Sequence, residues 1–221
     1  MIVKQIEAKL ASLQVGEPQM IKHGSKEVLS GIFKQASEEA RFVGTLGVQG
    51  DGQGDTIHHG GPDKAVCAYF EARYPYWTTL MGKPMTNGAF GENFTLSEWT
   101  EEDVCIGDIL TVGETTLQVS QPRQPCFKLG LRNDWPMLPA LAQETGYTGF
   151  YFRVLVEGFV KQGDAVKLEE RHPSRLTLAE ANRVMYIEKE NIKEIERLLS
   201  VRELAESWQS QLEKRLMKLR S

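Results

Sequence analysis

The sequence predicts a mainly β protein with some helix: a small barrel or sandwich followed by a three-helix C-terminal appendage. Short runs of alternating polar and apolar residues recur through the first 170 residues and are separated by turn residues, a pattern typical of closed or stacked sheets. From about residue 171 glycine disappears, and apolar residues recur at helical spacing. We therefore expect a β domain over residues 1–170 and the appendage over residues 171–221.

Strands and helices of the first region follow from local patterns. Alternation indicates strands at 3–8, 28–33, 109–112, 115–119, 151–156, 159–160 and 165–169. Gly113 with Glu114 occupies a turn position between two strands and predicts a hairpin, and Glu157 with Gly158 predicts a turn. Helical interruptions are expected at 65–80 and 136–145, and Gly146 is expected to end the second of them.

The tail carries its own helix signals. Thr177 and Glu180 form a capping-box pattern, which predicts the start of a helix. Two apolar stripes follow, each at helical spacing: Ile192, Ile195, Leu198 and Leu199, then Leu204, Trp208, Leu212, Leu216 and Leu219. Residues 171–221 contain 11 Lys and Arg against 8 Asp and Glu, mixed along the chain, so no basic stripe predicts a DNA-reading helix. The stripes are expected to be core or a dimer surface.

Composition and charge narrow the class of protein. The chain has 221 residues, 41% hydrophobic and 25% charged, with a net charge of -4, which argues against general nucleic-acid binding. Its first residues lack the apolar core of a signal peptide, and no apolar run is long enough to span a bilayer. The three cysteines are scattered, without a CxxC pair, so we expect a reducing cytoplasm, with Cys67 and Cys105 as small core residues.

Cys126 is the most informative residue of the chain. It follows a predicted strand, in a segment stiffened by Pro122 and Pro125 and containing Arg123. A nearby guanidinium favours the thiolate, which is the form of cysteine that attacks electrophiles or binds metals. The alternative is a small buried hydrophobic residue, the usual environment of a cysteine outside disulfides.

Two further stretches contain candidate binding residues. The glycine-rich segment 50–66 exposes backbone amides near Lys64 that could hold a phosphate, although it matches neither the P-loop nor the dinucleotide fingerprint and could be a surface turn. His58 and His59 are adjacent, so in a strand they would face opposite sides. Glu92 and Asn93 follow a glycine, where they could serve acid/base chemistry and ligand binding, or satisfy loop amides.

Taken in order, these stretches resemble the MOSC domain family, and within it the stand-alone bacterial YiiM type. The resemblance covers nearly the whole chain, including the three-helix tail. The matching segments are IHHGGPDKAV at 57–66, FGEN at 90–93, IGD at 106–108, SQPRQPCFKL at 120–129, GYTGFYFRVL at 146–155 and GD at 163–164.

The resemblance implies a MOSC-type β-barrel-like fold and a cofactor. In the reducing members of the family, the cysteine that matches Cys126 binds molybdenum beside the dithiolene of the molybdenum cofactor (molybdopterin). Transferred to this chain, that makes Cys126 the metal ligand. Arg123 is expected to meet anionic groups, with Cys126, Arg123 and Glu92 as the catalytic set. Candidates to bind the cofactor phosphate are Gly60, Gly61, Lys64 and Arg153, and candidates for the pterin edge or the substrate are His59, Glu92 and Asn93. Arg153 could instead pair with Asp108 or Asp164.

The implied activity is reduction of N-hydroxylated compounds, such as N-hydroxylated purine analogues, to amines, a detoxification reaction. The sequence contains no flavin, haem or iron–sulfur motif, so this activity would require a separate electron-donor protein. Neither a nucleic acid nor a membrane is expected as a partner, and a homodimer is left open. Two alternatives remain: a sulfur carrier holding a persulfide on Cys126, and a non-enzymatic carrier of the molybdenum cofactor.

Overall fold

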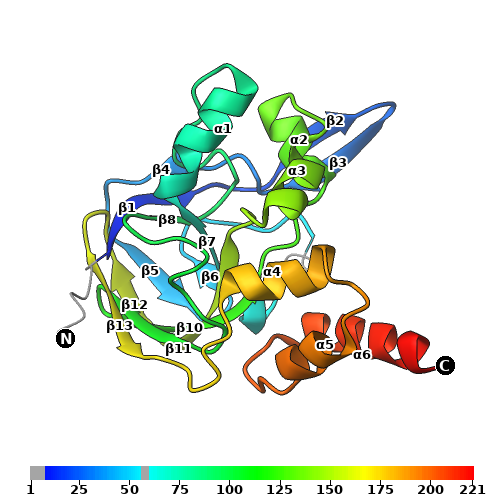
Figure 1. Ribbon diagram of the computed structural model, residues 1–221. Coiled ribbons are helices and arrows are strands. Elements are labelled where there is room, and N and C mark those ends of the chain that lie inside the picture. Colours follow the sequence, from blue (N-terminus) through cyan, green and yellow to red (C-terminus); the bar gives the residue numbers. More distant parts are fainter. Residues whose placement is uncertain (1–7, 56–59) are drawn as a thin grey trace.

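A computed structural model describes residues 8–55 and 60–221 of the chain. Its centre is a closed seven-stranded barrel with strand order β13-β9-β10-β11-β7-β8-β1, in which β1 pairs back onto β13 (Figure 1). Strands β7 and β8 are parallel and the other neighbours in the barrel are antiparallel, so the barrel is mixed. The barrel strands are β1 (Ala8–Val15), β7 (Val66–Phe70), β8 (Phe94–Leu96), β9 (Ile109–Val112), β10 (Thr115–Pro122), β11 (Phe150–Val156) and β13 (Ala165–Glu170).

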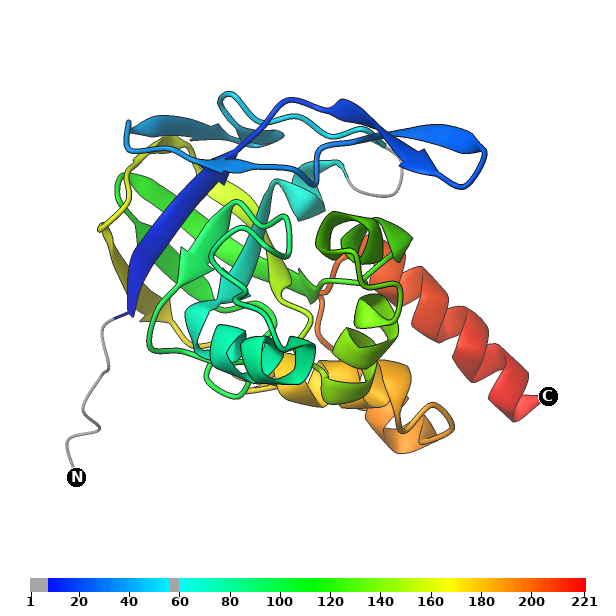
Figure 2. The same cartoon turned by 90° about the horizontal axis from the view of Figure 1, so that it is seen from above.

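Shorter strands extend from the barrel. β4 (Gln35–Ala36) pairs with the end of β1, and β12 (Gly158–Val160), β5 (Arg41–Gly44) and β6 (Gly47–Val48) form a small separate sheet. β2 (Gln19–His23) and β3 (Lys26–Ser30) form a hairpin that projects away from the barrel (Figures 1 and 2).

Apolar side chains fill the barrel. Leu10, Phe70, Phe94, Leu117 and Phe152 are each fully buried in one continuous core. Because small barrels are packed solid in this way, a ligand site is expected at a barrel end or beside it rather than along its axis.

Three helices cover one end of the barrel: α1 (Tyr74–Met81), α2 (Phe127–Asn133) and α3 (Leu138–Thr145). They enclose a second core around the fully buried Trp77 and Phe90. Gly82 ends α1 and Gly146 ends α3, each in a left-handed conformation (φ 71° and 76°) that glycine adopts without a steric cost.

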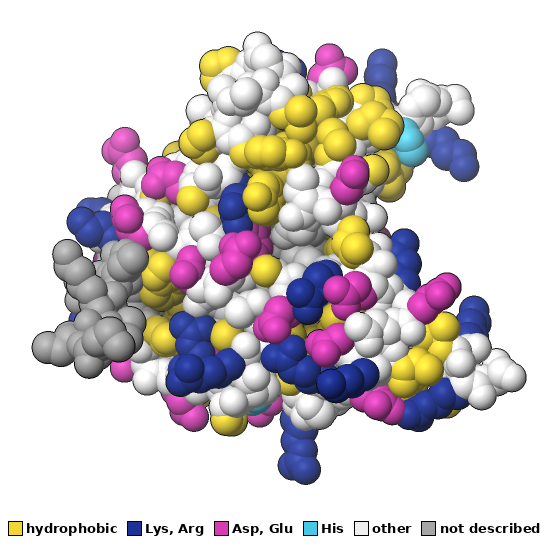
Figure 3. All heavy atoms as spheres, in the orientation of Figure 1, with side chains coloured by type: hydrophobic (Ala, Val, Ile, Leu, Met, Phe, Trp, Pro, Cys, Tyr) yellow, Lys and Arg dark blue, Asp and Glu magenta, His cyan; other side chains and the backbone are white. Residues whose placement is uncertain are grey.

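The tail forms three helices, α4 (Leu178–Tyr186), α5 (Ile192–Leu199) and α6 (Glu206–Arg220), beside the barrel (Figure 2). The capping box of Thr177 and Glu180 begins α4. Trp208 and Leu212 are fully buried and belong to the same core as the barrel, so the tail packs as part of the domain's interior. On the face seen in Figure 3, basic and acidic side chains intermingle over the tail.

Several predicted elements are confirmed: the 113–114 hairpin, the strands at 109–112, 115–119, 151–156 and 165–169, the helix ending at Gly146, and the three tail helices. The architecture is a barrel and not a sandwich. The strand predicted at 28–33 ends at Ser30, and the one predicted at 3–8 lies outside the described residues except for Ala8.

The helix predicted over 65–80 is wrong in its first third. Val66–Phe70 is strand β7, and helical structure begins only after it. All five residues are buried, because β7 lies between β8 and β11 inside the barrel wall. A continuous apolar run does not distinguish a buried strand from a buried helix, and here the neighbouring strands decide. In the described part of the chain, no helix combines the length and the apolarity that crossing a bilayer requires.

Candidate functional site

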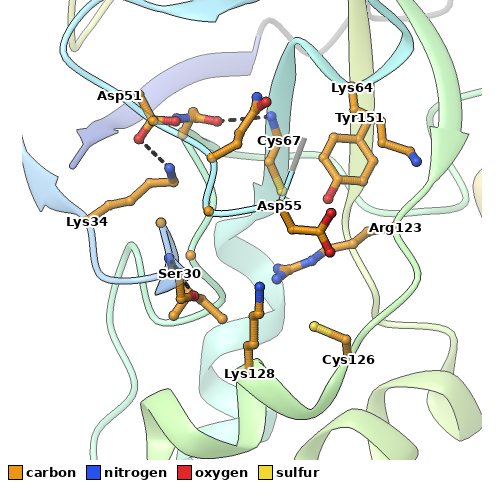
Figure 4. Close-up of a pocket in the computed structure, with 17 residues that line it drawn as sticks. Ser30, Lys34, Asp51, Asp55, Lys64, Cys67, Arg123, Cys126, Lys128 and Tyr151 are labelled. Atoms are coloured by element: carbon orange, nitrogen blue, oxygen red, sulfur yellow. Dashed lines mark hydrogen bonds and ion pairs between the residues drawn. The ribbon is translucent and has the colours of Figure 1, made fainter. Parts of the chain in front are cut away.

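A pocket lies where the Cys126 loop leaves the barrel, with about 550 Å³ of empty space including its open mouth. Segments far apart in the sequence build it: the chain after β3, the glycine-rich loop at 51–55, β7, β11, and the loop between β10 and α2 (Figure 4). Its polar and charged lining comes from Ser30, Lys34, Asp51, Gln53, Asp55, Lys64, Cys67, Asn93, Arg123, Cys126, Lys128 and Tyr151.

Cys126 lines this pocket from the position that precedes α2. It is partly exposed, and its sulfur is turned toward the pocket, on the side where the chains of Arg123 and Lys128 end (Figure 4). The preceding loop is held on two sides: the Arg123 amide donates to Gly149 O at 2.9 Å, and the Gln143 side chain donates to Pro125 O at 3.2 Å. The thiol is therefore presented by a restrained loop.

α6 adds a third attachment to the same loop. The Gln124 side-chain amide donates to Gln211 Oε1 at 2.8 Å, and Ser207 Oγ donates to Gln121 Oε1 at 2.9 Å. The Ala205 amide donates to Ser120 O at 3.0 Å, immediately before α6. The tail thus contacts both the end of β10 and the loop that carries Cys126.

Arg123 lies near Cys126 in the pocket lining and is buried, with 7% of its surface exposed (Figure 4). Its guanidinium donates to Phe90 O. Burial alone would lower the pKa of Arg123, but the surrounding groups Cys67, Tyr151, Cys126 and Glu92 together raise it. Arg123 consequently remains a cation close enough to Cys126 for their charges to interact.

Lysines surround the rest of the pocket. Lys34 forms an almost fully buried ion pair with Asp51, and Lys128 Nζ donates to Leu29 O at 3.2 Å. Burial lowers the pKa of Lys64, opposed by the charges of Asp63 and Asp55. Among the described residues, the lining holds four cationic side chains and two carboxylates, a balance of two positive charges that favours an anionic ligand.

Cys67 lies on the opposite wall from the loop, on β7. It is buried, as predicted, and it also lines the pocket. Burial raises the pKa of its thiol, and burial likewise raises the pKa of Tyr151, whose hydroxyl hydrogen-bonds to Cys67. Both groups therefore hold their protons at neutral pH, so Cys67 is a less reactive thiol than its place in the pocket suggests.

Asn93 lines the pocket, but its side chain is already bonded within the protein. Its Oδ1 accepts from the Cys67 amide at 3.1 Å, and its Nδ2 donates to Gln14 O at 3.2 Å and to Asp51 Oδ2 at 2.9 Å. It joins β1, β7 and the 51–55 loop, so the structure gives it a positioning role at the pocket wall.

Glu92 lies behind that wall and is fully buried. Its carboxylate accepts from the Tyr74 hydroxyl, from the amides of Gly88 (2.6 Å) and Phe90 (3.1 Å), and from Thr95 Oγ1 (2.8 Å). Such a set of donors satisfies a buried carboxylate, which agrees with the alternative that Glu92 satisfies loop amides. Glu92 does not line the pocket in the described structure.

Of the four residues predicted to bind the cofactor phosphate, one lines the pocket found for the described residues and three do not. Lys64 lines the pocket, whereas Arg153 pairs with Asp63, its Nε and Nη2 lying 2.8 and 2.5 Å from Oδ1, and also bonds Gln118 Oε1 at 2.7 Å. Within the described residues, neither Asp108 nor Asp164 is its partner. Gly60 and Gly61 fall outside the lining found for the described residues, although a Cβ on Gly61 would meet only open space. His59, with His58, lies outside the described residues.

Sequence patterns did not identify Lys34, Asp51, Asp55, Lys128 and Tyr151 as lining residues. All except Lys34 lie inside the motif segments described above, in which other residues were the candidates. Lys34 carried no local signal, because only the path of the chain after β3 brings it to the pocket.

Comparisons with known proteins agree with this architecture. The MOSC domain model matches residues 55–167, and the model described as "YiiM-like, 3-alpha helix domain" matches residues 176–219. The chain is 43% identical to the uncharacterized protein YflK of Bacillus subtilis, over 96% of each chain. It is 36% identical to protein YiiM of Escherichia coli, over 84% of each.

A fungal relative and two solved structures extend these similarities. A protein named "Reductase" from Gibberella moniliformis is 37% identical over 72% of this chain and 29% of its own length. The crystal structure of YiiM from Geobacillus stearothermophilus superposes with a TM-score of 0.82 at 39% identity, covering 95% of this chain and 99% of that one. YiiM from Escherichia coli gives 0.79 at 28% identity, covering 96% and 93%.

Proposed function

The chain belongs to the MOSC domain family, of the YiiM type, and we propose that it binds the molybdenum cofactor through Cys126 and reduces N-hydroxylated compounds to amines. The observation that carries the proposal is a partly exposed thiol, on a restrained loop, beside a pocket whose described lining has an excess of two positive charges. The fungal relative named "Reductase" supports oxidoreduction as the class of reaction.

The donor set of the pocket fits such a cofactor. Thiolate is a soft ligand suited to heavy transition metals, and Cys126 is the more exposed of the two cysteines that line the pocket. The cofactor carries a phosphate and, at the metal, oxygen ligands, so it is anionic where Arg123, Lys64 and Lys128 would meet it. The cofactor supplies the two-electron chemistry, and the protein supplies ligation, orientation and charge.

The residues of the chain have separable tasks in this proposal. Cys126 ligates, and Arg123 supplies a buried positive charge beside it that would meet the anionic cofactor. Asn93 and the pair of Lys34 with Asp51 keep the pocket wall in place. The overall reaction converts an N-hydroxyl group, two electrons and two protons into an N–H group and water, with the electrons delivered by a separate donor protein.

The primary test is elemental analysis of protein made in cells that produce the cofactor. We expect about one molybdenum per chain in the wild type, loss of the metal in Cys126→Ser, and retention in Cys67→Ser, the matched cysteine on the opposite wall. Equal molybdenum in wild type and Cys126→Ser would refute ligation by this residue.

Turnover is tested separately on the loaded protein. With a strong chemical reductant in place of the donor protein, we expect an N-hydroxylated purine to be converted to the amine. Bound molybdenum without turnover would indicate a cofactor carrier. Metal-free protein with cyanide-releasable sulfur on Cys126 would indicate a persulfide carrier.

A further inference from the structure

Tyr151 places a neutral hydroxyl in the pocket of the candidate site. It lies on β11 between Phe150 and Phe152, which are fully buried in the barrel core. Because successive side chains of a strand point to opposite faces, Tyr151 points out of the barrel, and it lines the pocket with 7% of its surface exposed. In Figure 4 its hydroxyl end is turned into the pocket, toward the ends of the Asp55 and Arg123 side chains. A ligand in the pocket can therefore meet this hydroxyl.

A bulge in β10 fixes the position of Tyr151. Ser120 is an extra residue of β10 relative to β11, because the pairs on either side of it join adjacent residues of β11. These pairs are Val119 with Phe152 and Gln121 with Tyr151. Ser120 Oγ also donates to Tyr151 O at 3.0 Å. Bulges occur beside active sites, where they redirect a side chain, and this one lies on the strand that leads into the loop carrying the exposed thiol.

Cys67 lies on the other side of Tyr151, as its cross-strand partner on β7. Burial raises the pKa of each group, so both hold their protons at neutral pH. A phenol has one O–H donor and lone pairs that accept, so the Cys67 thiol can donate its S–H to the phenol oxygen. The O–H of Tyr151 is then able to donate into the pocket. The positive charge of Arg123 acts on the same phenol and makes the O–H a more polar donor.

The charged part of the lining is suited to a different ligand. Lys64, Lys128 and Arg123 are cations, which favour the anionic groups of a cofactor. The Asn93 side chain is bonded within the protein through both its oxygen and its nitrogen. An uncharged N-hydroxyl group calls for a neutral donor, and Tyr151 supplies one.

We propose that the Tyr151 hydroxyl donates a hydrogen bond to the oxygen of the substrate's N-hydroxyl group and thereby selects the N-hydroxylated base over its amine. This inference rests on the function proposed above, in which that oxygen leaves as water. Substrate and product differ by this one oxygen atom, so a donor directed at it favours binding of the substrate and release of the product. Because the phenol keeps its proton, Tyr151 positions the oxygen and does not supply the protons of the reaction.

The test measures equilibrium binding without a reductant, so that no turnover occurs. Full-length protein from cofactor-producing cells is titrated calorimetrically with N-hydroxyadenine and, separately, with adenine. We expect the wild type to bind N-hydroxyadenine at least about fivefold more tightly, since one hydrogen bond contributes about 1 kcal/mol. Tyr151→Phe should weaken binding of N-hydroxyadenine about fivefold and change binding of adenine less than about twofold.

Tyr76→Phe is the matched control for loss of a phenol hydroxyl. Tyr76 lies on α1, is 41% exposed and is not part of the lining found for the described residues. This variant should bind both purines as the wild type does. Molybdenum per chain in Tyr151→Phe should equal that of the wild type. Loss of the metal from Tyr151→Phe would assign the hydroxyl to the cofactor and overturn the proposal.

Two other results would also overturn it. One is equal affinity of the wild type for N-hydroxyadenine and adenine, or an equal loss of affinity for both in Tyr151→Phe. The other is a crystal structure of the complex in which the hydroxyl oxygen of N-hydroxyadenine lies beyond hydrogen-bonding distance of Tyr151 Oη. A wild type that binds N-hydroxyadenine selectively but never converts it would refute the reductase activity and leave this contact standing, so the two failures are distinguishable.

Discussion

Arg153 and Arg123 were both candidates to bind the cofactor or its anionic groups, and the structure places them differently. Arg123 is buried and faces Cys126, whereas Arg153 is fixed by Asp63 and Gln118. Both Arg153 Nη1 and Nη2 also lie 3.4 Å from Glu203 O, in the segment before α6. These contacts make Arg153 a link between the barrel and the tail.

A substitution separates that structural role from the cofactor role predicted from the sequence. We expect Arg153→Ala to lower the free energy of unfolding by about 1–2 kcal/mol, since the ion pair is only partly exposed. Denaturant melts would measure this, with the exposed Arg202→Ala as the control. Molybdenum content per folded chain should be unchanged; its loss without destabilisation would instead restore the cofactor role.

Glu101 makes the stability of the fold depend on pH. Its folded pKa, about 7, lies above the ordinary value of 4.5 because the carboxyl is buried. The native state therefore holds this proton longer than the unfolded chain does. The stabilisation that this bound proton gives the folded state is complete below pH 4.5, and it is lost as pH rises through 7.

The corresponding measurement is the free energy of unfolding between pH 5 and pH 8. Relative to Glu101→Gln, the wild type should lose about 3 kcal/mol over this range, because each pH unit between the unfolded and folded pKa values corresponds to about 1.4 kcal/mol. Glu102, whose side chain is 65% exposed, supplies the control through Glu102→Gln. Parallel curves for wild type and Glu101→Gln would contradict the assignment.

At the scale of elements, the Cys126 loop is the joint between a barrel strand and a helix. β10 ends at Pro122 and α2 begins at Phe127, so only four residues connect them. α6 contacts this joint from outside through Ser207 and Gln211. The tail is thereby coupled to the reactive loop by hydrogen bonds as well as by the shared core.

Removing the side chains of Ser207 and Gln211 should make the Cys126 loop more mobile without unfolding the tail. In the double variant Ser207→Ala with Gln211→Ala, we expect hydrogen exchange of the Arg123 amide to accelerate roughly thirtyfold, because the two lost bonds together contribute about 2 kcal/mol. Gln209→Ala is the matched control, since the hydrogen bonds of the Gln209 side chain run to Leu204 O and Arg202 O, inside the tail. Equal exchange in the double variant and the control would show that α6 does not restrain the loop.

At the scale of the whole molecule, apolar side chains fill the barrel interior, and the cavities that could hold a ligand lie around it. The Cys126 pocket lies beside the β2–β3 hairpin and α2, and a second cavity lies between the loop after β8, the end of α3 and α4. α4 joins the barrel through the backbone bridge of Cys105 with Thr177 and through the buried core. Both cavities are therefore formed between elements, as ligand sites commonly are.

The sequence by itself determined the elements whose signals are local. Alternation, turn residues and the capping box identify the strands from 109 to 169 and the tail helices, because period and caps depend on near neighbours in the chain. The ordered motifs, with Cys126 among them, identified the family. Residue type alone could not tell that Glu92 is sealed behind the wall or that Arg153 is bonded to Asp63.

Tertiary structure decided the remaining features, which depend on long-range contacts. β7 is a strand because β8 and β11 flank it, and Lys34 reaches the pocket because the chain turns back after β3. Glu101 and Asn182, which are 81 positions apart, both line a cavity between the loop after β8, the end of α3 and α4. No local pattern encodes this proximity, because only packing brings the two residues to one cavity.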